Sequence, residues 1–255
     1  MYTGEDMRQT PNPTLLVFTL GAARESARRS LVPGALRGLE IGLREGCLTA
    51  ALDAGRGCGC RLEVSSPARL ALPPEVSHVP QPGADFGDRL ARAMDAAFAR
   101  GAGPLLVVGT DVPGLSAEPL REALDLLADE PNRVVLGPSP DGGLYLLAAC
   151  RPIAGLAAAV RWCGRATLGD LLRHLEAAGR PVVLLTPLAD LDRPSDLDGW
   201  ISRAGADARW RGLARLLRQA LAGLRRPLVP AALGGPRFAF SPVHAGRAPP
   251  APPSR

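Results

Sequence analysis

Short apolar runs alternate with amphipathic stretches along most of this chain, and glycine or proline residues separate them. Residues 15–18 and 105–108 are apolar at every position, which is typical of strands buried on both faces of a sheet. Further strands are predicted at residues 47–52, 61–64, 75–79 at a sheet edge, 133–136, 144–149 and 181–186.

Helical spacing occupies most of the intervals between these runs. Between residues 85 and 101, Phe86, Leu90, Met94 and Phe98 are placed to share one face of a helix. Other helices are predicted at residues 37–45, from a cap at Ser116 to residue 128, at 167–178, and after the run 190–196. This alternation predicts an α/β fold with a mostly parallel central sheet, helices on both faces, and a ligand at the carboxyl ends of the strands.

The last part of the chain has a different pattern. Beyond Ala206 an amphipathic stretch carries a leucine stripe, formed by Leu213, Leu216, Leu217, Leu221 and Leu224. Residues 227–255 are rich in proline, alanine and glycine, so we expect a partly disordered tail. The predicted organisation is a polar lead-in over residues 1–13, one domain over 14–226, and this tail.

Composition agrees with a single domain, because 255 residues with 46% hydrophobic content can bury one substantial core. There is no apolar run long enough to span a membrane, and the N-terminus is polar, so we expect a soluble, cytoplasmic protein. All 30 basic residues are arginine, which excludes lysine Schiff-base chemistry. The net charge of +5 comes from a local arginine excess after residue 203, which does not indicate a nucleic-acid partner.

The five cysteines do not suggest a disulfide framework, since their number is odd and they are scattered. Cys58 and Cys60 could bind a soft metal, but tetrahedral zinc needs more ligands than this pair offers. Half-buried or loop thiols are the favoured interpretation.

Asp111 is the first candidate for chemistry. It follows a predicted central strand directly, between Gly109 and Pro113, so its carboxylate should project into a cleft at the sheet edge. A hard cation such as Mg²⁺ prefers carboxylate oxygens together with substrate phosphates. The alternative is a turn aspartate that caps the following helix.

Two other segments carry candidate residues. The loop at residues 137–143 contains Asp141, Gly142 and Gly143, which either approach a ligand closely or form a tight hairpin turn. Asp190, Asp192 and Asp196 follow the last predicted strand; Asp192 could be a second metal ligand, or it could cap the next helix. Tyr145 and Trp162 could line a pocket or belong to the core.

These segments, in this order, resemble a bacterial family of GT-A-type transferases, described as radical-SAM and selenodomain-associated transferases and linked in some members to arsenosugar glycosylation. The resemblance runs over residues 81–197. Its motifs read Gln-Pro-Gly-Ala-Asp-Phe-Gly-Asp-Arg-Leu at 81–90, Gly-Thr-Asp-Val-Pro-Gly-Leu at 109–115, Asp-Gly-Gly-Leu-Tyr-Leu at 141–146 and Asp-Leu-Asp-Arg-Pro-Ser-Asp-Leu at 190–197. The family is related to guanylyltransferases of molybdenum-cofactor and phospholactate metabolism.

The resemblance implies a single GT-A-like (Rossmann-like) domain, Mg²⁺ or Mn²⁺ as the cofactor, and Asp111 as the metal aspartate at a strand end. It also implies that Gly109 and Thr110 lie at the nucleotide phosphates. Asp192 matches an acidic position of the family. Gly142, Gly143, Tyr145 and Trp162 fall in the loop and wall on the acceptor side.

The first loop departs from the family pattern. Members carry a Lys-x-Pro-x-x-Gly-x-x-Lys-Thr-Arg-Leu segment after the first strand, whereas Glu25 stands here at the glycine. Arg24, Arg28 and Arg29 keep positive charge in this loop and are the candidates to contact phosphate, although a guanidinium does not reproduce a compact ammonium.

The hypothesis is a metal-dependent transferase that passes a group from a nucleotide-activated donor, most simply a nucleotide sugar, to a small-molecule acceptor. Asp111 and Asp141 are its candidate catalytic residues, and Asp141 is placed to take the acceptor's proton. A nucleotidyltransferase would use the same parts. A non-catalytic relative with a degenerate first loop is the alternative from a different class.

Overall fold

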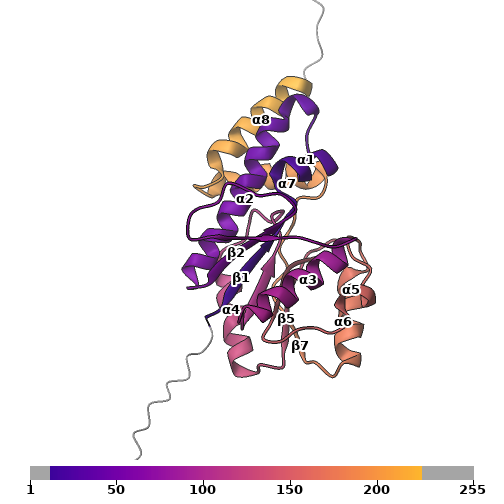
Figure 1. Cartoon of the computed structure of the whole chain (residues 1–255). Coiled ribbons are helices and arrows are strands. Elements are labelled where there is room, and N and C mark those ends of the chain that lie inside the picture. The colour runs from indigo at the N-terminus through magenta and orange to yellow at the C-terminus, as the bar shows by residue number, and fades with distance from the viewer. Residues whose placement is uncertain (1–11, 226–255) are drawn as a thin grey trace, which may run out of the picture.

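The computed structural model describes residues 12–225 of the chain (Figure 1). Its centre is a seven-stranded sheet with the order β3-β2-β1-β4-β6-β5-β7, in which β6 alone runs antiparallel to its neighbours. The strands are β1 (Thr14–Phe18), β2 (Arg61–Ser66), β3 (Ser77–Pro80), β4 (Leu105–Val108), β5 (Val134–Pro138), β6 (Leu144–Ala149) and β7 (Val182–Leu184).

Helices connect most of these strands, so the predicted alternation of strand and helix is confirmed except between β2 and β3 and between β5 and β6. The longer ones are α2 (Arg37–Gly57), α3 (Phe86–Ala99), α4 (Ala117–Asp129), α6 (Thr167–Ala177), α7 (Pro194–Arg203) and α8 (Arg211–Arg225). The short ones are α1 (Ala22–Arg28), α5 (Leu156–Ala159) and the 3₁₀ turns η1 (Gly34–Leu36) and η2 (Ala204–Ala206).

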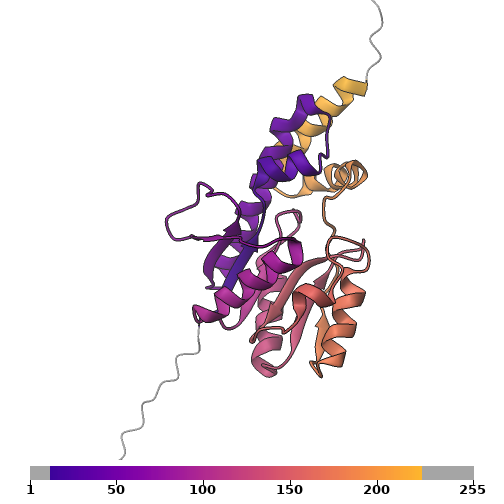
Figure 2. The same ribbon diagram turned by 45° about the vertical axis from the view of Figure 1, so that its right-hand side comes forward.

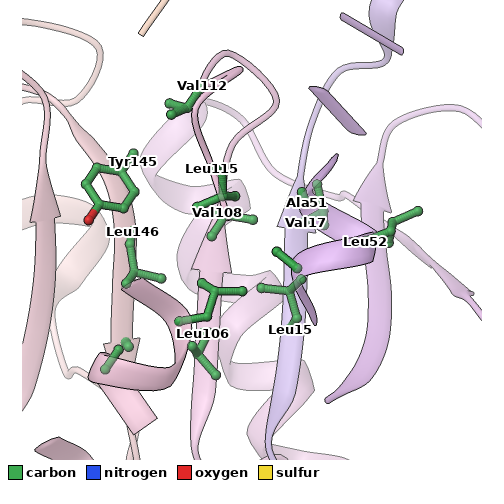
Figure 3. Close-up of a cluster of buried hydrophobic side chains, with 14 of the residues drawn as sticks. Leu15, Val17, Ala51, Leu52, Leu106, Val108, Val112, Leu115, Tyr145 and Leu146 are labelled. Carbon is green, nitrogen blue, oxygen red and sulfur yellow. The ribbon is translucent and has the colours of Figure 1, made fainter. Parts of the chain in front are cut away.

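The sheet is covered on both faces, as β1 illustrates. Leu15 and Val17 point into a cluster formed with α2 and α4, part of which is drawn in Figure 3. Leu16 and Phe18 point the other way, into a cluster formed with α3, α5 and α6. Since successive strand residues face opposite sides, a fully apolar strand needs an apolar layer on each face.

The strand predicted at residues 47–52 is wrong, because this segment lies in the middle of α2. Cys47, Ala50, Ala51 and Ala54 are all buried, and their spacing is helical. A short run of small apolar residues does not distinguish a buried strand from a buried helix. Alanine favours the helix, and Gly55 lets the helix approach the sheet closely. A Cβ at Gly55 would lie 2.6 Å from the side chains of Leu15 and Leu62.

Two other local interpretations are decided by the structure. Of the predicted loop at residues 137–143, Gly137 and Pro138 belong to β5, and residues 139–143 join β5 to the antiparallel β6 as a hairpin loop. α4 begins after Ser116 as predicted, although the Ser116 side chain makes no capping hydrogen bond. The short helix α5 was not predicted, since four residues carry too little periodicity.

α7, α8 and the first half of α2 build a third apolar cluster beyond the end of the sheet. Figures 1 and 2 show α8 lying alongside α2. Leu217 of the predicted leucine stripe is fully buried, whereas Leu216 and Leu224 are 50% and 52% exposed. No helix among the described residues is long and apolar enough to cross a membrane. The predicted tail at 227–255 lies outside the described residues.

Candidate functional site

A cavity of about 240 Å³ opens where β1, β4 and β5 end and β6 begins. β1 and β4 are parallel neighbours whose connections leave toward opposite edges of the sheet. Such a switch point leaves a crevice at the carboxyl ends of the strands. The cavity therefore lies where the strand pattern predicted a ligand.

Asp111 reaches this cavity from the loop that follows β4. Its carboxylate folds back over Gly109, where an added Cβ would lie 2.8 Å from Asp111 Oδ1. The N-cap of α4 is Ser116, so Asp111 is not the helix cap that was the alternative interpretation. The backbone N–H of Leu191 donates to the carbonyl of Asp111 at 2.8 Å, which ties this loop to the later acidic run.

Three further carboxylates gather beside it, those of Asp141, Asp190 and Asp192. One oxygen of each lies within 4.8 Å of the others. Asp141 comes from the hairpin loop, where its Oδ1 also accepts a hydrogen bond from the Gly143 N–H at 2.8 Å. Asp190 and Asp192 stand on either side of Leu191, whose side chain is buried in the third cluster. Tertiary contacts thus bring two acidic segments to one place.

Burial and neighbouring charges raise the pKa values of two aspartates in the cavity. Burial, followed by the charges of Glu25, Asp192 and Asp190, raises the pKa of Asp111 to about 7. Burial, followed by the charges of Asp141 and Asp192, raises the pKa of Asp190 to about 6. Carboxylates that repel each other in a confined space gain from a shared cation, and oxygen donors suit Mg²⁺ or Mn²⁺.

The cap of α7 is made by a different aspartate from the one expected. Asp196 accepts hydrogen bonds from the backbone N–H groups of Arg193 at 2.8 Å and of Asp192 at 3.2 Å. The Asp192 side chain instead forms an ion pair with Arg29. Its carboxylate is therefore directed toward the cavity rather than to the helix end.

The segment expected to be a loop after β1 is mostly the short helix α1, with Arg29 as its C-cap, so the predicted loop is wrong over residues 22–28. Its three arginines, still called the first-loop arginines below, occupy different positions. Arg29 lines the cavity and is neutralised by Asp192. Arg28 lines the cavity and has no ion-pair partner among residues 12–225. Arg24 is exposed and does not line the cavity. Of the three candidates for phosphate contact, Arg28 is the one with an uncommitted charge at the site.

Glu25 and Arg44 are two site residues that the motif comparison did not single out as functional. Glu25 lines the cavity, and its carboxylate accepts hydrogen bonds from the Thr19 hydroxyl at 2.7 Å and the Leu20 N–H at 3.0 Å. Thr110 donates to the same carboxylate at 3.2 Å. The Thr110 side chain is thus engaged by Glu25, whereas Gly109 faces the cavity. The only sequence signal was a glutamate standing at a glycine position.

Aromatic and apolar side chains form the opposite wall. Phe86 packs against Phe18 and Trp162, with ring centroids 5.3 and 5.5 Å apart. The segment carrying Trp162 is held by Asp170 of α6, which accepts hydrogen bonds from Arg161 Nε at 2.7 Å and Nη2 at 2.9 Å. This ion pair fixes the wall of the cavity against α6.

The remaining candidates on the acceptor side occupy mixed positions. Gly143 and Trp162 line the cavity, whereas Gly142 does not. Gly142 has φ +94°, and a Cβ there would lie 2.4 Å from the Arg165 carbonyl oxygen. Tyr145 borders the cavity but is buried, packs on Gly137 and donates to the Thr186 carbonyl at 3.1 Å. Gly142 and Tyr145 hold the hairpin in place.

Residues 57–164 match the model of a bacterial family described as "Uncharacterized protein conserved in bacteria (DUF2064)". The matched segment includes Asp111 and Asp141 but neither the first loop nor the run at 190–196. No curated protein shows a significant sequence match to this chain.

Several solved structures are similar to this chain, and the first of them shows the same fold. An inferred nucleotide-diphospho-sugar transferase from Desulfovibrio desulfuricans G20 aligns with a TM-score of 0.69 at 22% identity, over 84% of this chain and 97% of that chain. Rv0371c from Mycobacterium tuberculosis H37Rv, in complex with manganese, aligns with a TM-score of 0.47 at 19% identity, over 74% and 97%. A CMP:2-keto-3-deoxy-manno-octonic acid synthetase complexed with CTP aligns with a TM-score of 0.44 at 12% identity, over 82% and 99%.

Proposed function

We propose that this chain is a metal-dependent transferase that moves a group from a nucleotide-activated donor, most simply a nucleotide sugar, to a small-molecule acceptor. The observation that carries the proposal is the group of three aspartates, Asp141, Asp190 and Asp192, in the cavity that Asp111 also lines at the carboxyl ends of the central strands. Shape and charge agree with this function, because the cavity combines an acidic side with an apolar, aromatic side.

The acidic side suits Mg²⁺ or Mn²⁺. Asp190 and Asp192, which lie together with Asp141, would hold the ion with Asp111 beside them. Burial first, and then the neighbouring carboxylates, raise the pKa values of Asp111 and Asp190, so a cation would stabilise their charged forms. When bound, such an ion would neutralise the donor phosphates and the charge on the leaving group. Within the chain, Arg28 is positioned to add positive charge on the donor side.

The acceptor side is assigned to Asp141 and the aromatic wall. Asp141 is exposed, borders the cavity and is held in place by the Gly143 N–H, so it can take a proton from an acceptor hydroxyl. The Trp162 and Phe86 rings offer an apolar surface against which one face of the acceptor can pack. A nucleotidyltransferase would use the same cavity with an acceptor phosphate.

One observation favours a second candidate, a relative that binds a ligand without turning it over. Arg44 is paired with Glu25 and Arg29 with Asp192, so two guanidinium charges that could bind a diphosphate are already neutralised inside the chain. A binding protein can keep such internal pairs, because it has no leaving group to stabilise.

Thermal unfolding with a panel of nucleotide sugars and nucleoside triphosphates tests the proposal. A ligand that binds only the folded state raises Tm, and here the rise should require Mg²⁺ or Mn²⁺ and disappear in EDTA. Turnover is then measured for Asp141→Asn, with the exposed helix residue Asp125→Asn as the matched control. The transferase predicts normal binding and lost turnover in Asp141→Asn only.

Two results would count against this function. If no nucleotide raises Tm with either metal, the nucleotide-binding assignment is overturned. If a nucleotide binds but the wild type transfers nothing to any acceptor, the binding-only candidate is supported.

A further inference from the structure

Several hydrogen-bond donors converge on the Glu25 carboxylate. The Thr19 hydroxyl and the Leu20 N–H donate to Oε1 at 2.7 and 3.0 Å, and the Thr110 hydroxyl lies 3.2 Å from Oε2. Arg44 Nη1 lies 3.5 Å from Oε2. These groups come from the ends of β1 and β4 and from α2, so three separate segments aim donors at one point.

Such a set of donors is what an oxyanion requires. A backbone N–H, two hydroxyls and a guanidinium are the groups that proteins use to bind carboxylate or phosphate oxygens. We call the four donors, Thr19, Leu20, Thr110 and Arg44, the cradle.

The cradle is held together by contacts that do not involve Glu25. The Thr19 and Thr110 hydroxyls lie 2.9 Å apart, and the Gly21 N–H donates to the Thr19 hydroxyl at 3.0 Å. Arg44, only 6% exposed, is bound to the Glu40 carboxylate and to the Arg29 carbonyl. Removing the Glu25 side chain would therefore leave the donors in position, with the Leu20 N–H and one threonine hydroxyl lacking their acceptor and Arg44 still paired with Glu40.

We propose that Glu25 is a built-in anion that closes a binding site for an oxyanion, and that it thereby determines which part of a ligand enters the cavity. While Glu25 occupies the cradle, a carboxylate or phosphate group of a ligand is excluded by both volume and charge. This part of the proposal depends only on the contacts around Glu25 and not on the proposed transferase activity. The consequence for the donor, that its phosphates lie toward Arg28 and the aspartates and not in the cradle, rests on the proposed function.

Supplying the missing carboxylate from solution tests this directly. In Glu25→Ala, sodium acetate should raise Tm in a saturable manner by about 2 °C or more relative to sodium chloride at equal ionic strength. The wild type, and the exposed Glu176→Ala as a matched loss of one carboxylate, should respond to the two salts alike. Glu25→Gln, which keeps the cradle filled, should also respond alike.

A second arm uses inorganic pyrophosphate in EDTA, measured by calorimetry. Its affinity should be at least about ten-fold higher for Glu25→Ala than for the wild type, since the charge and volume that exclude it are gone. A gain with acetate but not with pyrophosphate would identify the cradle as a carboxylate site, and a gain with both as a general oxyanion site.

If Glu25→Ala does not fold in chloride, Glu25→Ser takes its place, and refolding in acetate is the readout. Equal acetate responses in wild type and variant, or failure of acetate to restore a fold, would overturn the proposal. These results are independent of the nucleotide experiment. Loss of the acetate effect leaves the proposed transferase intact, and absence of nucleotide binding leaves the cradle intact.

Discussion

The backbone N–H of Leu191 donates a 2.8 Å hydrogen bond to the carbonyl oxygen of Asp111. This single bond joins the loop after β4 to the acidic run before α7, and the buried side chain of Leu191 anchors it. Asp190 and Asp192, on either side of Leu191, are consequently held at the Asp111 carboxylate. A backbone hydrogen bond thus places the acidic side chains together in the cavity.

Metal affinity should rise with pH. Asp190 and Asp111 have pKa values of about 6 and 7, and each must lose its proton before it can bind a cation. Calorimetric titration with Mn²⁺ should give an affinity about ten-fold or more higher at pH 8 than at pH 5.5. Asp111→Asn should bind more weakly and show a shallower pH dependence. A pH-independent affinity would contradict the assignment of these carboxylates as ligands.

Without metal, the same pKa shift makes stability fall as pH rises. The pKa of Asp111 is raised in the folded state, so between about pH 4 and 7 the folded chain holds a proton that the unfolded chain has lost. Asp111→Asn has no such proton, so it lacks this pH-dependent contribution to stability. In EDTA, the difference in free energy of unfolding between Asp111→Asn and the wild type should therefore shift by about 2 kcal/mol in favour of the variant when the pH is raised from 5 to 8. Denaturant titrations at the two pH values check this. If the difference between variant and wild type is the same at both pH values, folding does not disfavour the ionised form of Asp111.

Gly109→Ala should displace the Asp111 carboxylate without unfolding the chain. The added Cβ would lie 2.8 Å from Asp111 Oδ1, which is too close for both to remain. Mn²⁺ affinity should fall about ten-fold or more, because the ligand moves out of position. Gly114→Ala, in the same loop with open space around its Cβ, is the matched control and should bind like wild type. Equal affinities for the two variants would place the metal away from Asp111.

The three arginines of the first loop should differ in their effects on nucleotide affinity. Arg28→Ala removes the cavity guanidinium that has no ion-pair partner within the described part of the chain, and it should weaken nucleotide binding about ten-fold to a hundred-fold. Arg29→Ala frees Asp192 from its ion pair, so metal affinity should increase. Arg24→Ala, outside the cavity, is the internal control. If all three variants bind nucleotide as the wild type does, this loop does not contact the donor.

Packing of the third apolar cluster can be tested at two glycines of α2. A Cβ at Gly46 would lie 2.6 Å from the Trp210 ring, and Trp210 also donates to the Pro113 carbonyl at 3.0 Å. Gly46→Ala should lower the free energy of unfolding by about 1–3 kcal/mol. Gly42→Ala meets open space and should raise it by about 0.5–1 kcal/mol, as alanine favours the helix. Thermal unfolding of both variants measures the difference, and equal Tm values would show that Trp210 adapts.

The sequence by itself determined the central elements and the place of Asp111 at the sheet edge. The runs at β1 and β4 are apolar at every position, so burial on both faces was readable, and Asp111 followed β4 at the edge where ligands bind. The segment at residues 47–52 was misread because its local pattern is compatible with either element, and only its packing between the sheet and α8 selects the helix.

Tertiary structure alone decided what surrounds Asp111. Asp192 looked like either a metal ligand or a helix-cap residue, Asp190 had no assigned role, and Glu25 looked like a departure from a loop pattern. Their roles depend on contacts between distant segments: the Leu191–Asp111 hydrogen bond, the Arg29–Asp192 ion pair, and the donors from β1, β4 and α2 that meet at Glu25. Local sequence encodes which faces are apolar, whereas the distance between charges in a cavity depends on how separate elements pack, and that distance sets both their pKa values and their affinity for a ligand.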